Sequence, residues 1–477
     1  MWIGIGEPLN QQVGSPGTNG ASTTITVPSG FTYTTYPFNI KRTWNGGITH
    51  DFDITTIIPA ITNTWYVDPV SGNDGTAVVN DRTHPLLNLA TALAKNPCDQ
   101  VRIINLTSNF LGRTTKSWNN VQPAVSMSVV VEGNFRYISG KFASATVPTW
   151  IVNGSFANVY QTTIASASAA KVIDTSIQAF VPYSDKNNAT QLADLAAPIY
   201  SSYTNVGSAA AVSALAGSWF HDGTNLHVRA LDDRSLIGDA ALVLSTTGNN
   251  GRYGAVTNNL TLYVQGIDFV GGNAPFLALT ALTGNTGTIA FNKCSFQGAQ
   301  TASNGLSIQG KLTVYGYRNG AYYNQADGFN YHSFEADGVT TGSSPTFVEI
   351  DCVSVGNGTT GSAGTSDNAS TCHDFVNGIR INGIYVNSDD RVLAETNSAQ
   401  TWNLGCYVGQ AIQTAAGRES IAALLTSHVW IDSVYTKGGA NPQWIAAQSS
   451  TLNYFKSGNV VNAGTGEATG TVAVYVP

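Results

Sequence analysis

The segments Glu349-Ile-Asp-Cys352-Val-Ser-Val355 and Ile381-Asn-Gly383-Ile-Tyr-Val386 repeat one pattern, in which a small residue separates two short apolar stretches. From about residue 260 onward the pattern recurs, with separations of 22 to 36 residues between the small residues. A small side chain in a fixed slot, followed by turn residues, is typical of stacked parallel coils. The repeat therefore predicts a β-solenoid, with antiparallel hairpins in a sandwich as the alternative. The aligned small residues are Gly266, Cys294, Gly316, Cys352, Gly383 and Cys406.

The composition of the 477 residues supports an all-β protein. Short alternating runs, such as residues 260–269, predict many strands, and the depletion of strong helix formers counts against helical bundles. The net charge is −7 with no basic run, which excludes the electrostatic surface that nucleic acid and anionic membranes require. No stretch approaches the roughly 20 apolar residues of a membrane helix. We therefore expect no nucleic-acid partner and no membrane insertion.

A segment near residue 64 carries the most specific resemblance. Thr64-Trp-Tyr-Val-Asp-Pro-Val-Ser-Gly-Asn-Asp-Gly75, followed by Pro85-Leu-Leu-Asn-Leu-Ala-Thr-Ala-Leu93, resembles the first coil of pectate-lyase-like right-handed parallel β-helix proteins. One departure is the Leu-Leu pair after Pro85, where an aromatic residue or Thr is usual. In that family the short helix closes the N-terminal end of the solenoid and protects an unpaired parallel edge. The resemblance covers roughly residues 64–445 and implies a right-handed parallel β-helix with a capping helix.

Composition and this resemblance divide the chain into five parts. Residues 1–63 are rich in Gly, Thr, Pro and aromatic residues without the coil pattern, and we expect a flexible or partner-ordered arm. Residues 64–149 begin the β-helix. Residues 150–245 resemble a small β insertion carried on a coil, residues 246–446 form the main coils, and residues 447–477 provide a C-terminal strand or cap.

The cysteines and histidines lack the spacing of a metal site. Five cysteines cannot all pair within one chain, and neither a C-x-x-C nor an H-E-x-x-H motif is present. We therefore expect free buried thiols, no metal site and no cofactor.

Candidate catalytic residues concentrate between residues 322 and 406. Asp327, Asp351 and Asp374 are spaced at close to one coil each, so a solenoid is expected to bring them to one face. Acids one coil apart would be about 5 Å from each other and acids two coils apart about 10 Å, in or near the ranges of retaining and inverting glycosidases. A histidine oriented by an acid would instead serve as the base of a lyase or esterase. The candidate catalytic residues are Asp327, Asp351, Asp374, His373, Glu349 and His332.

Aromatic and amide side chains border these acids. This is the composition of a sugar-binding groove, because sugar rings pack on aromatic faces while hydroxyl groups bind amides. The alternative is structural, with polar ladders that satisfy solenoid turns and aromatic rings that fill the core. The candidate substrate-binding residues are Tyr322, Tyr323, Asn330, Tyr331, Asn357, Asn368, Arg380 and Trp402.

The β-helix pattern, the distinct arm and the unpaired cysteines resemble a bacteriophage tailspike or tail-fibre protein. That resemblance implies a homotrimer made in the host cytoplasm without a leader, attached to other tail proteins through its arm. It also implies recognition of a bacterial surface polysaccharide, with depolymerisation of that glycan left open. The alternatives are a free, secreted bacterial polysaccharide lyase or glycoside hydrolase, and a non-catalytic structural virion protein.

Overall fold

A computed structural model describes the chain except for several segments, and all structural statements below concern the described residues. These are residues 22–44, 46–142, 147–164, 171–178, 198–245, 248–254, 259–279, 286–300, 303–334, 343–358, 367–409, 419–436, 444–447, 449–455 and 471–475.

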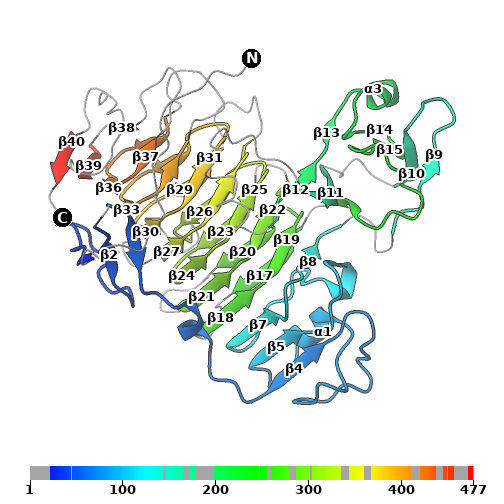
Figure 1. Cartoon of the computed structure of the whole chain (residues 1–477), viewed down its shortest axis with the longest axis horizontal. Coiled ribbons are helices and arrows are strands. Elements are labelled where there is room, and N and C mark those ends of the chain that lie inside the picture. Colours follow the sequence, from blue (N-terminus) through cyan, green and yellow to red (C-terminus); the bar gives the residue numbers. More distant parts are fainter. Residues whose placement is uncertain are drawn as a thin grey trace.

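The protein is an all-β solenoid whose coils stack three parallel sheets, as in a parallel β-helix (Figure 1). We call them the long sheet, the nine-stranded sheet and the eight-stranded sheet. The main coils pass through them in that order.

The described strands of the long sheet are β4 (Thr64–Val67), β5 (Gln100–Ile103), β7 (Met127–Val131), β18 (Leu260–Gln265), β21 (Gly287–Asn292), β24 (Leu312–Tyr317), β27 (Thr346–Ile350), β30 (Asn377–Ile381), β33 (Gln400–Leu404), β36 (His428–Asp432), β39 (Thr451–Phe455) and β40 (Thr471–Tyr475). Those of the nine-stranded sheet are β6 (Phe110–Gly112), β8 (Tyr137–Gly140), β19 (Ile267–Val270), β22 (Ser295–Gln297), β25 (Gly320–Tyr322), β28 (Val353–Val355), β31 (Ile384–Val386), β34 (Tyr407–Val408) and β37 (Tyr435–Thr436). Those of the eight-stranded sheet are β17 (Gly251–Gly254), β20 (Phe276–Leu279), β23 (Leu306–Gln309), β26 (Phe329–His332), β29 (Ser370–Cys372), β32 (Leu393–Glu395), β35 (Ile421–Ala423) and β38 (Trp444–Ala446).

The turn from the long sheet to the nine-stranded sheet, which we call the tight corner, explains the sequence repeat. Its first residue adopts a left-handed backbone in coil after coil of the described chain. Its second residue faces the core, where Cys294, Cys352 and Cys406 are buried free thiols, as predicted. The sequence alignment of small residues was wrong at two positions. Gly266 is the first residue of its tight corner rather than the second, and Gly316 lies inside β24. The first residues are Gly266, Lys293, Arg318, Asp351, Asn382, Gly405 and Ser433.

The N-terminal end of the solenoid is closed by the segment after β4. Helix α1 (Leu89–Leu93) buries Leu89 and Leu93 in the core of the coils. The Asp74 carboxylate accepts hydrogen bonds from the backbone N–H groups of Leu87 and Asn88 and from the side chains of Asn88 and Thr91, which orders the start of this helix. The outer edge of β4 is covered by hydrogen bonds to Asn80 and Leu86, which protects an otherwise unpaired strand edge.

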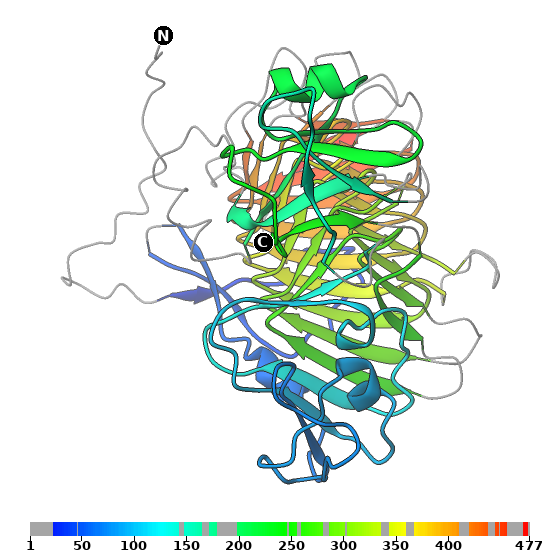
Figure 2. The same cartoon turned by 90° about the vertical axis from the view of Figure 1, so that its right-hand side faces the viewer.

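The insertion forms its own small β structure at one side of the solenoid (Figure 1), and it lies in front of the coils in Figure 2. Its Tyr200 packs against the outer face of the nine-stranded sheet and donates its hydroxyl hydrogen to Asp268, which also pairs with Arg136. These contacts dock the insertion on the coils. Its elements are β9 (Ile151–Val152), β10 (Tyr160–Thr163), β11 (Lys171–Gln178), β12 (Tyr200–Ser202), β13 (Thr204–Asn205), α3 (Ala209–Ala214), β14 (Ser218–His221), β15 (Asn225–Arg229) and β16 (Leu242–Ser245).

The described part of the N-terminal arm is not free, which corrects the expectation of a flexible or partner-ordered segment for residues 22–63. It contains β1 (Thr23–Thr24), β2 (Ile40–Arg42), β3 (Ile48–His50) and the 3₁₀-helix η1 (Ile54–Ile57). Its apolar residues pack on the outer face of the long sheet, where the strands themselves present apolar side chains. The aromatic and aliphatic residues of the arm therefore form a second core. The arm residues buried there are Ile25, Phe31, Tyr33, Phe38, Ile40, Ile48, Phe52 and Ile54.

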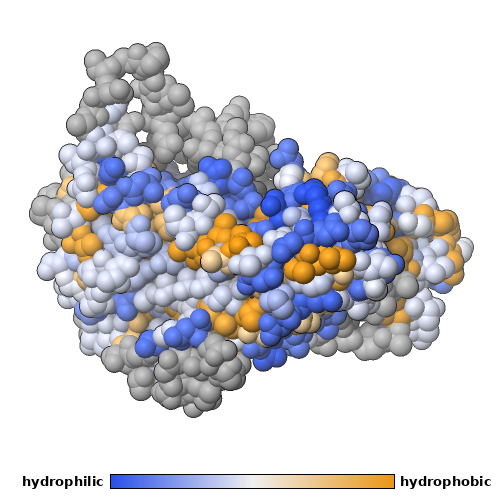
Figure 3. Space-filling model, turned by 90° about the horizontal axis from the view of Figure 1, so that it is seen from below, coloured by the Kyte–Doolittle hydropathy of each residue, from blue (hydrophilic) through white to orange (hydrophobic). Residues whose placement is uncertain are grey.

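At the other end, β40 extends the long sheet by pairing with β39 in parallel, so the C-terminal strand packs on the last coil. On the face seen in Figure 3, hydrophobic side chains form separate patches between polar ones. No helix among the described residues is long and apolar enough to cross a membrane.

Candidate functional site

The three candidate aspartates lie at three different corners of the solenoid. Asp327 precedes β26, Asp351 occupies the tight corner, and Asp374 follows β29. Arg318 is the first tight-corner residue one coil before Asp351. Asp327 lies between these two corners, partway along the coil, and therefore does not stack on Asp351. The residue stacked on Asp351 is Asn382, the first tight-corner residue of the next coil. The expected cluster of three carboxylates on one face is therefore wrong.

Asp351 faces the N-terminal arm rather than a groove. Its carboxylate lies 3.6 Å from the Nε atom of Arg318, and burial raises its pKa against the opposing effect of His50 and Arg318. It belongs to the contact between the arm and the tight corner.

Glu349 and Arg380 lie inside the solenoid, which corrects their assignment to a substrate groove. Arg380 pairs with Glu395 at 2.6 Å, and its Nε atom lies 3.6 Å from Glu349. All three side chains are at most 2% exposed. The Tyr331 hydroxyl donates to Glu349 at 2.6 Å, and the Tyr385 hydroxyl donates to the other carboxylate oxygen. Burial raises the pKa of Glu349, while Arg380 opposes that shift.

The remaining aromatic candidates are also structural. Tyr331 stacks on Phe347 in the core, with ring centroids 4.1 Å apart. Trp402 is buried beneath the arm, and Tyr322 is buried on the outer face of the nine-stranded sheet. The backbone carbonyl of Tyr323 accepts a hydrogen bond from Lys171 of the insertion. None of these rings lies with the carboxylates in one sugar-binding groove.

Asn357 belongs to a buried ladder between coils. Its side-chain oxygen accepts from the backbone and side-chain N–H groups of Asn324, and its Nδ2 atom donates to the carbonyl of Ala321. It is fully buried and satisfies turn backbone, as the structural alternative predicted.

The structure does bring part of the predicted set together at the outer face of the eight-stranded sheet. Asp327 accepts hydrogen bonds from the Asn330 side chain at 2.6 Å and from the backbone N–H of Asn368 at 2.8 Å. The Asn368 side chain in turn donates to Thr371 at 2.9 Å. This network joins two adjacent coils and is almost wholly buried, so it fixes the edge of the sheet.

A second row on the same face is only partly buried, and we call it the histidine row: Gln309, His332 and His373 on β23, β26 and the end of β29. The two imidazole centroids are 6.2 Å apart. His332 Nδ1 lies 2.7 Å from the Ser333 carbonyl, which can only accept, so Nδ1 carries a hydrogen. Asp374 follows His373 in the chain. Its carboxylate accepts hydrogen bonds from the Ser333 N–H and from the Asn397 side chain.

This arrangement offers amide and imidazole groups to a ligand on three successive coils. The carboxylate of Asp327, in contrast, accepts hydrogen bonds from within the protein, from Asn330 and Asn368. Among the described residues, no group of three or more His, Cys, Asp or Glu side chains is arranged to hold a metal ion.

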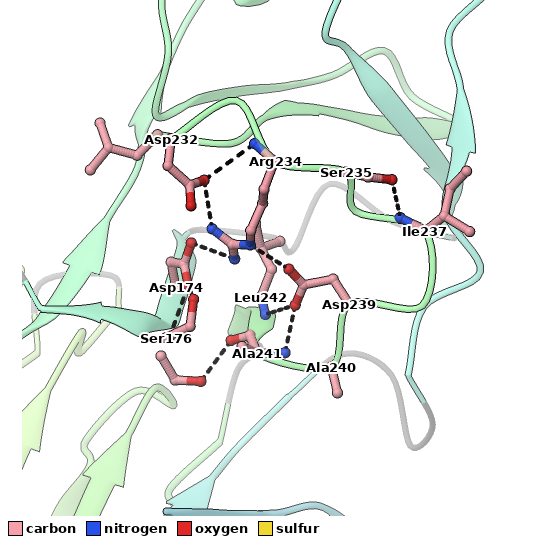
Figure 4. Close-up of polar contacts among 12 residues, drawn as sticks. Asp174, Ser176, Asp232, Arg234, Ser235, Ile237, Asp239, Ala240, Ala241 and Leu242 are labelled. Carbon is pink, nitrogen blue, oxygen red and sulfur yellow. Dashed lines mark hydrogen bonds and ion pairs between the residues drawn. The ribbon is translucent and has the colours of Figure 1, made fainter.

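Sequence reasoning missed several charged positions. Figure 4 shows Arg234 of the insertion, whose guanidinium binds Asp174 at 2.7 Å, Asp232 at 2.9 Å and Asp239 at 2.8 Å. This hub ties β11 to the loop before β16. Glu395, the interior partner of Arg380, was also missed, because it follows an apolar pair in an ordinary strand pattern. Gln309 and Asn397 carried no sequence signal that we recognised.

Comparisons with known proteins find solved structures whose sequences differ widely from this chain. No family model and no curated protein matches the chain. A structure described as the complex of XylC with xylose covers 85% of this chain and 72% of its own, at 8% identity and a TM-score of 0.41. A structure described as a glycoside hydrolase covers 87% and 97%, at 8% identity and a TM-score of 0.46. The GH136 lacto-N-biosidase from Eubacterium ramulus covers 86% and 68%, at 8% identity and a TM-score of 0.24. Because the identities are 8% and the TM-scores are below 0.5, the sugars in these descriptions concern those proteins alone.

Proposed function

We propose that the protein is a carbohydrate-active protein whose polysaccharide ligand lies along the histidine row. The observation that carries the proposal is the register of Gln309, His332 and His373, which places three hydrogen-bonding side chains on successive coils of one sheet face. Parallel strands are about 4.8 Å apart, so the row repeats its polar groups at short, regular intervals. A chain of sugars offers hydroxyl groups in the same repetitive way.

The groups in the row suit a carbohydrate better than they suit an ionic ligand. Amides and imidazoles both donate and accept hydrogen bonds, as sugar hydroxyls do. The buried network of Asp327, Asn330 and Asn368 beside the row holds the strands that carry it, so the binding groups are fixed before a ligand arrives.

Binding can be tested with a panel of soluble polysaccharides embedded in native gels, in which a bound protein is retarded. We expect at least one polysaccharide to retard the wild type, and Gln309→Ala and His373→Ala to weaken that binding by about tenfold, since each removes hydrogen bonds worth about 1 kcal/mol or more. His84→Ala is the matched control, because His84 is an exposed histidine in a loop beside the first coil. Equal retardation of all variants would reject this face as the binding site.

Cleavage of the bound glycan is a second candidate function, favoured by the tautomer of His332. With the hydrogen on Nδ1, the Nε2 atom is the position that takes up or gives a proton, and His373 provides a second imidazole nearby. The pair would divide base and acid roles in a lyase or hydrolase. New reducing ends, or the ultraviolet absorption of an unsaturated product, would report cleavage. His332→Gln should then abolish product formation while binding persists.

The biological setting is a further proposal, and the packing of residues 22–57 favours a free polysaccharide-degrading protein over a tail fibre. A virion attachment role would use the arm as a contact for a partner, whereas the apolar residues of this segment are buried against their own solenoid. Native mass measurement separates the two settings in part: a trimer of about 150 kDa would support the tail-fibre proposal, and a monomer of about 50 kDa the free protein.

A further inference from the structure

The N-terminal arm crosses several coils of the long sheet. Phe52 packs on Tyr315 of β24, with ring centroids 5.3 Å apart. Further along, the Asn382 side chain donates to the backbone carbonyl of Ile48, and Arg42 pairs with Asp432 at the end of β36. The arm is therefore a strap that runs against the direction of stacking, and its release would expose an apolar sheet face.

His50 is the titratable residue at the centre of this contact. Its ring lies between Phe38 of the arm and Tyr317 of the long sheet, with centroid distances of 6.4 and 6.3 Å. The backbone N–H of Phe52 donates to His50 Nδ1 at 3.2 Å. Because Nδ1 accepts this bond, it carries no hydrogen while the arm is docked. A second proton on the imidazole must go to Nδ1 and would break the bond.

The charges facing His50 come from both sides of the contact. Asp51 and Lys41 lie on the arm, where they form a pair at 3.9 Å, and Asp351 and Arg318 lie at the tight corner. Burial lowers the pKa of His50, which outweighs the opposite effects of Asp351 and Asp51. Burial also raises the pKa of Asp351, so acid removes the carboxylate that would otherwise compensate a charged imidazole.

We propose that His50 is an acid-sensitive latch, and that its protonation releases the arm from the long sheet. The direction of this pH effect follows from the proton affinity of the imidazole in the docked and released states. The released arm binds the proton more readily than the docked arm, so docking is complete above about pH 6.5 and weakens as the pH falls below that value. Asp351 by itself has the opposite effect on docking. Its pKa is higher in the docked state, so its protonation at lower pH favours the docked arm.

Hydrogen exchange of the full chain, followed by mass spectrometry of peptides from residues 39–52, tests the latch. After correction for intrinsic exchange rates, protection of these amides in the wild type should fall by up to about tenfold between pH 7.5 and pH 5.5, the limit reached when the released imidazole titrates at its ordinary pKa and the docked imidazole stays neutral. His50→Asn should keep the arm docked at both pH values, because the amide oxygen can accept from Phe52 N–H and takes up no proton. His50→Lys should release it at both.

A matched control is His428→Asn. His428 is a partly buried imidazole that stacks on Trp430 in the same sheet and bonds to Thr451, so it shares the surroundings without contacting the Phe52 N–H. It should retain the wild-type response. Equal protection of the wild-type arm at both pH values would overturn the proposal, as would an undiminished acid response in His50→Asn or its loss in His428→Asn. If His50→Asn fails to dock at pH 7.5, the wild-type measurement and His50→Gln decide the question.

Discussion

Phe31 lies edge-on against Trp430, with ring centroids 5.6 Å apart and an interplanar angle of 69°, although the two residues come from opposite ends of the chain. Phe31 also contacts Trp402 of the preceding coil, at 6.0 Å. One side chain thus joins the arm to two late coils of the long sheet.

Phe31→Ala should weaken docking of the arm by about 3 kcal/mol, the usual cost of removing a buried phenylalanine ring. Hydrogen exchange in residues 22–44 would increase, while exchange in the core strands would change little. The control is Trp44→Ala, because Trp44 is 68% exposed and should leave exchange unchanged. If Phe31→Ala exchanges like the wild type, the ring does not anchor the arm.

Arg380→Met should destabilise the fold by about 3–5 kcal/mol, because it leaves the buried carboxylates Glu349 and Glu395 without their cation. Chemical denaturation measures the loss. The triple variant that adds Glu349→Gln and Glu395→Gln should recover much of the stability, since it removes the uncompensated charge. A triple variant as unstable as Arg380→Met would show that packing of the guanidinium matters more than charge balance.

Glu349→Gln should change the pH dependence of unfolding in a defined direction. Burial raises the pKa of Glu349, so this carboxyl group stabilises the folded state below its unfolded pKa and loses that contribution as pH rises through the folded value. Relative to the wild type, the variant should therefore gain stability as pH rises from about 4 and then level off. Denaturation curves at several pH values give this difference, and a flat difference would contradict it.

Lys171→Met should remove a pH dependence in the docking of the insertion. Lys171 donates to the Tyr323 carbonyl, and burial lowers its pKa to about 8. In the wild type, stability should rise between about pH 8 and about pH 10.5, because the released lysine holds its proton more firmly over that range. Thermal unfolding of both proteins across this range provides the test. A parallel rise in Lys171→Met would assign the effect to another group.

The solenoid was predictable because its signal is local and repeated. Each tight corner needs a left-handed residue followed by a core-facing one, and Cys294, Cys352 and Cys406 mark that second position in the sequence. The register was not predictable in the same way. Coils differ in length, because their turns do, so counting from Asp327 to Asp351 led to a neighbour that the fold does not provide.

The prediction of site residues was wrong mainly in strands that are apolar on both faces, where the sequence does not show which way a side chain points. In β27, Phe347 and Glu349 point into the core while Val348 and Ile350 lie under the arm. Alternation normally separates inside from outside, but here the arm makes the outer face apolar as well, so the pattern gave no orientation for Glu349. The outward orientation of Asn330 and His332 could be read from the sequence, because their strand alternates more clearly.

The tight corners keep the same short length in most coils, whereas the turns from the nine-stranded to the eight-stranded sheet vary in length, and the whole insertion enters the chain at such a turn, between β8 and β17. The stack thus separates a fixed spine from a side that tolerates new sequence. The histidine row lies at the opposite ends of the eight-stranded-sheet strands, so additions at these turns change neither the row nor the register of a strand. New sequence can therefore accumulate on one side of the stack while the core and the opposite edge of the sheet stay intact.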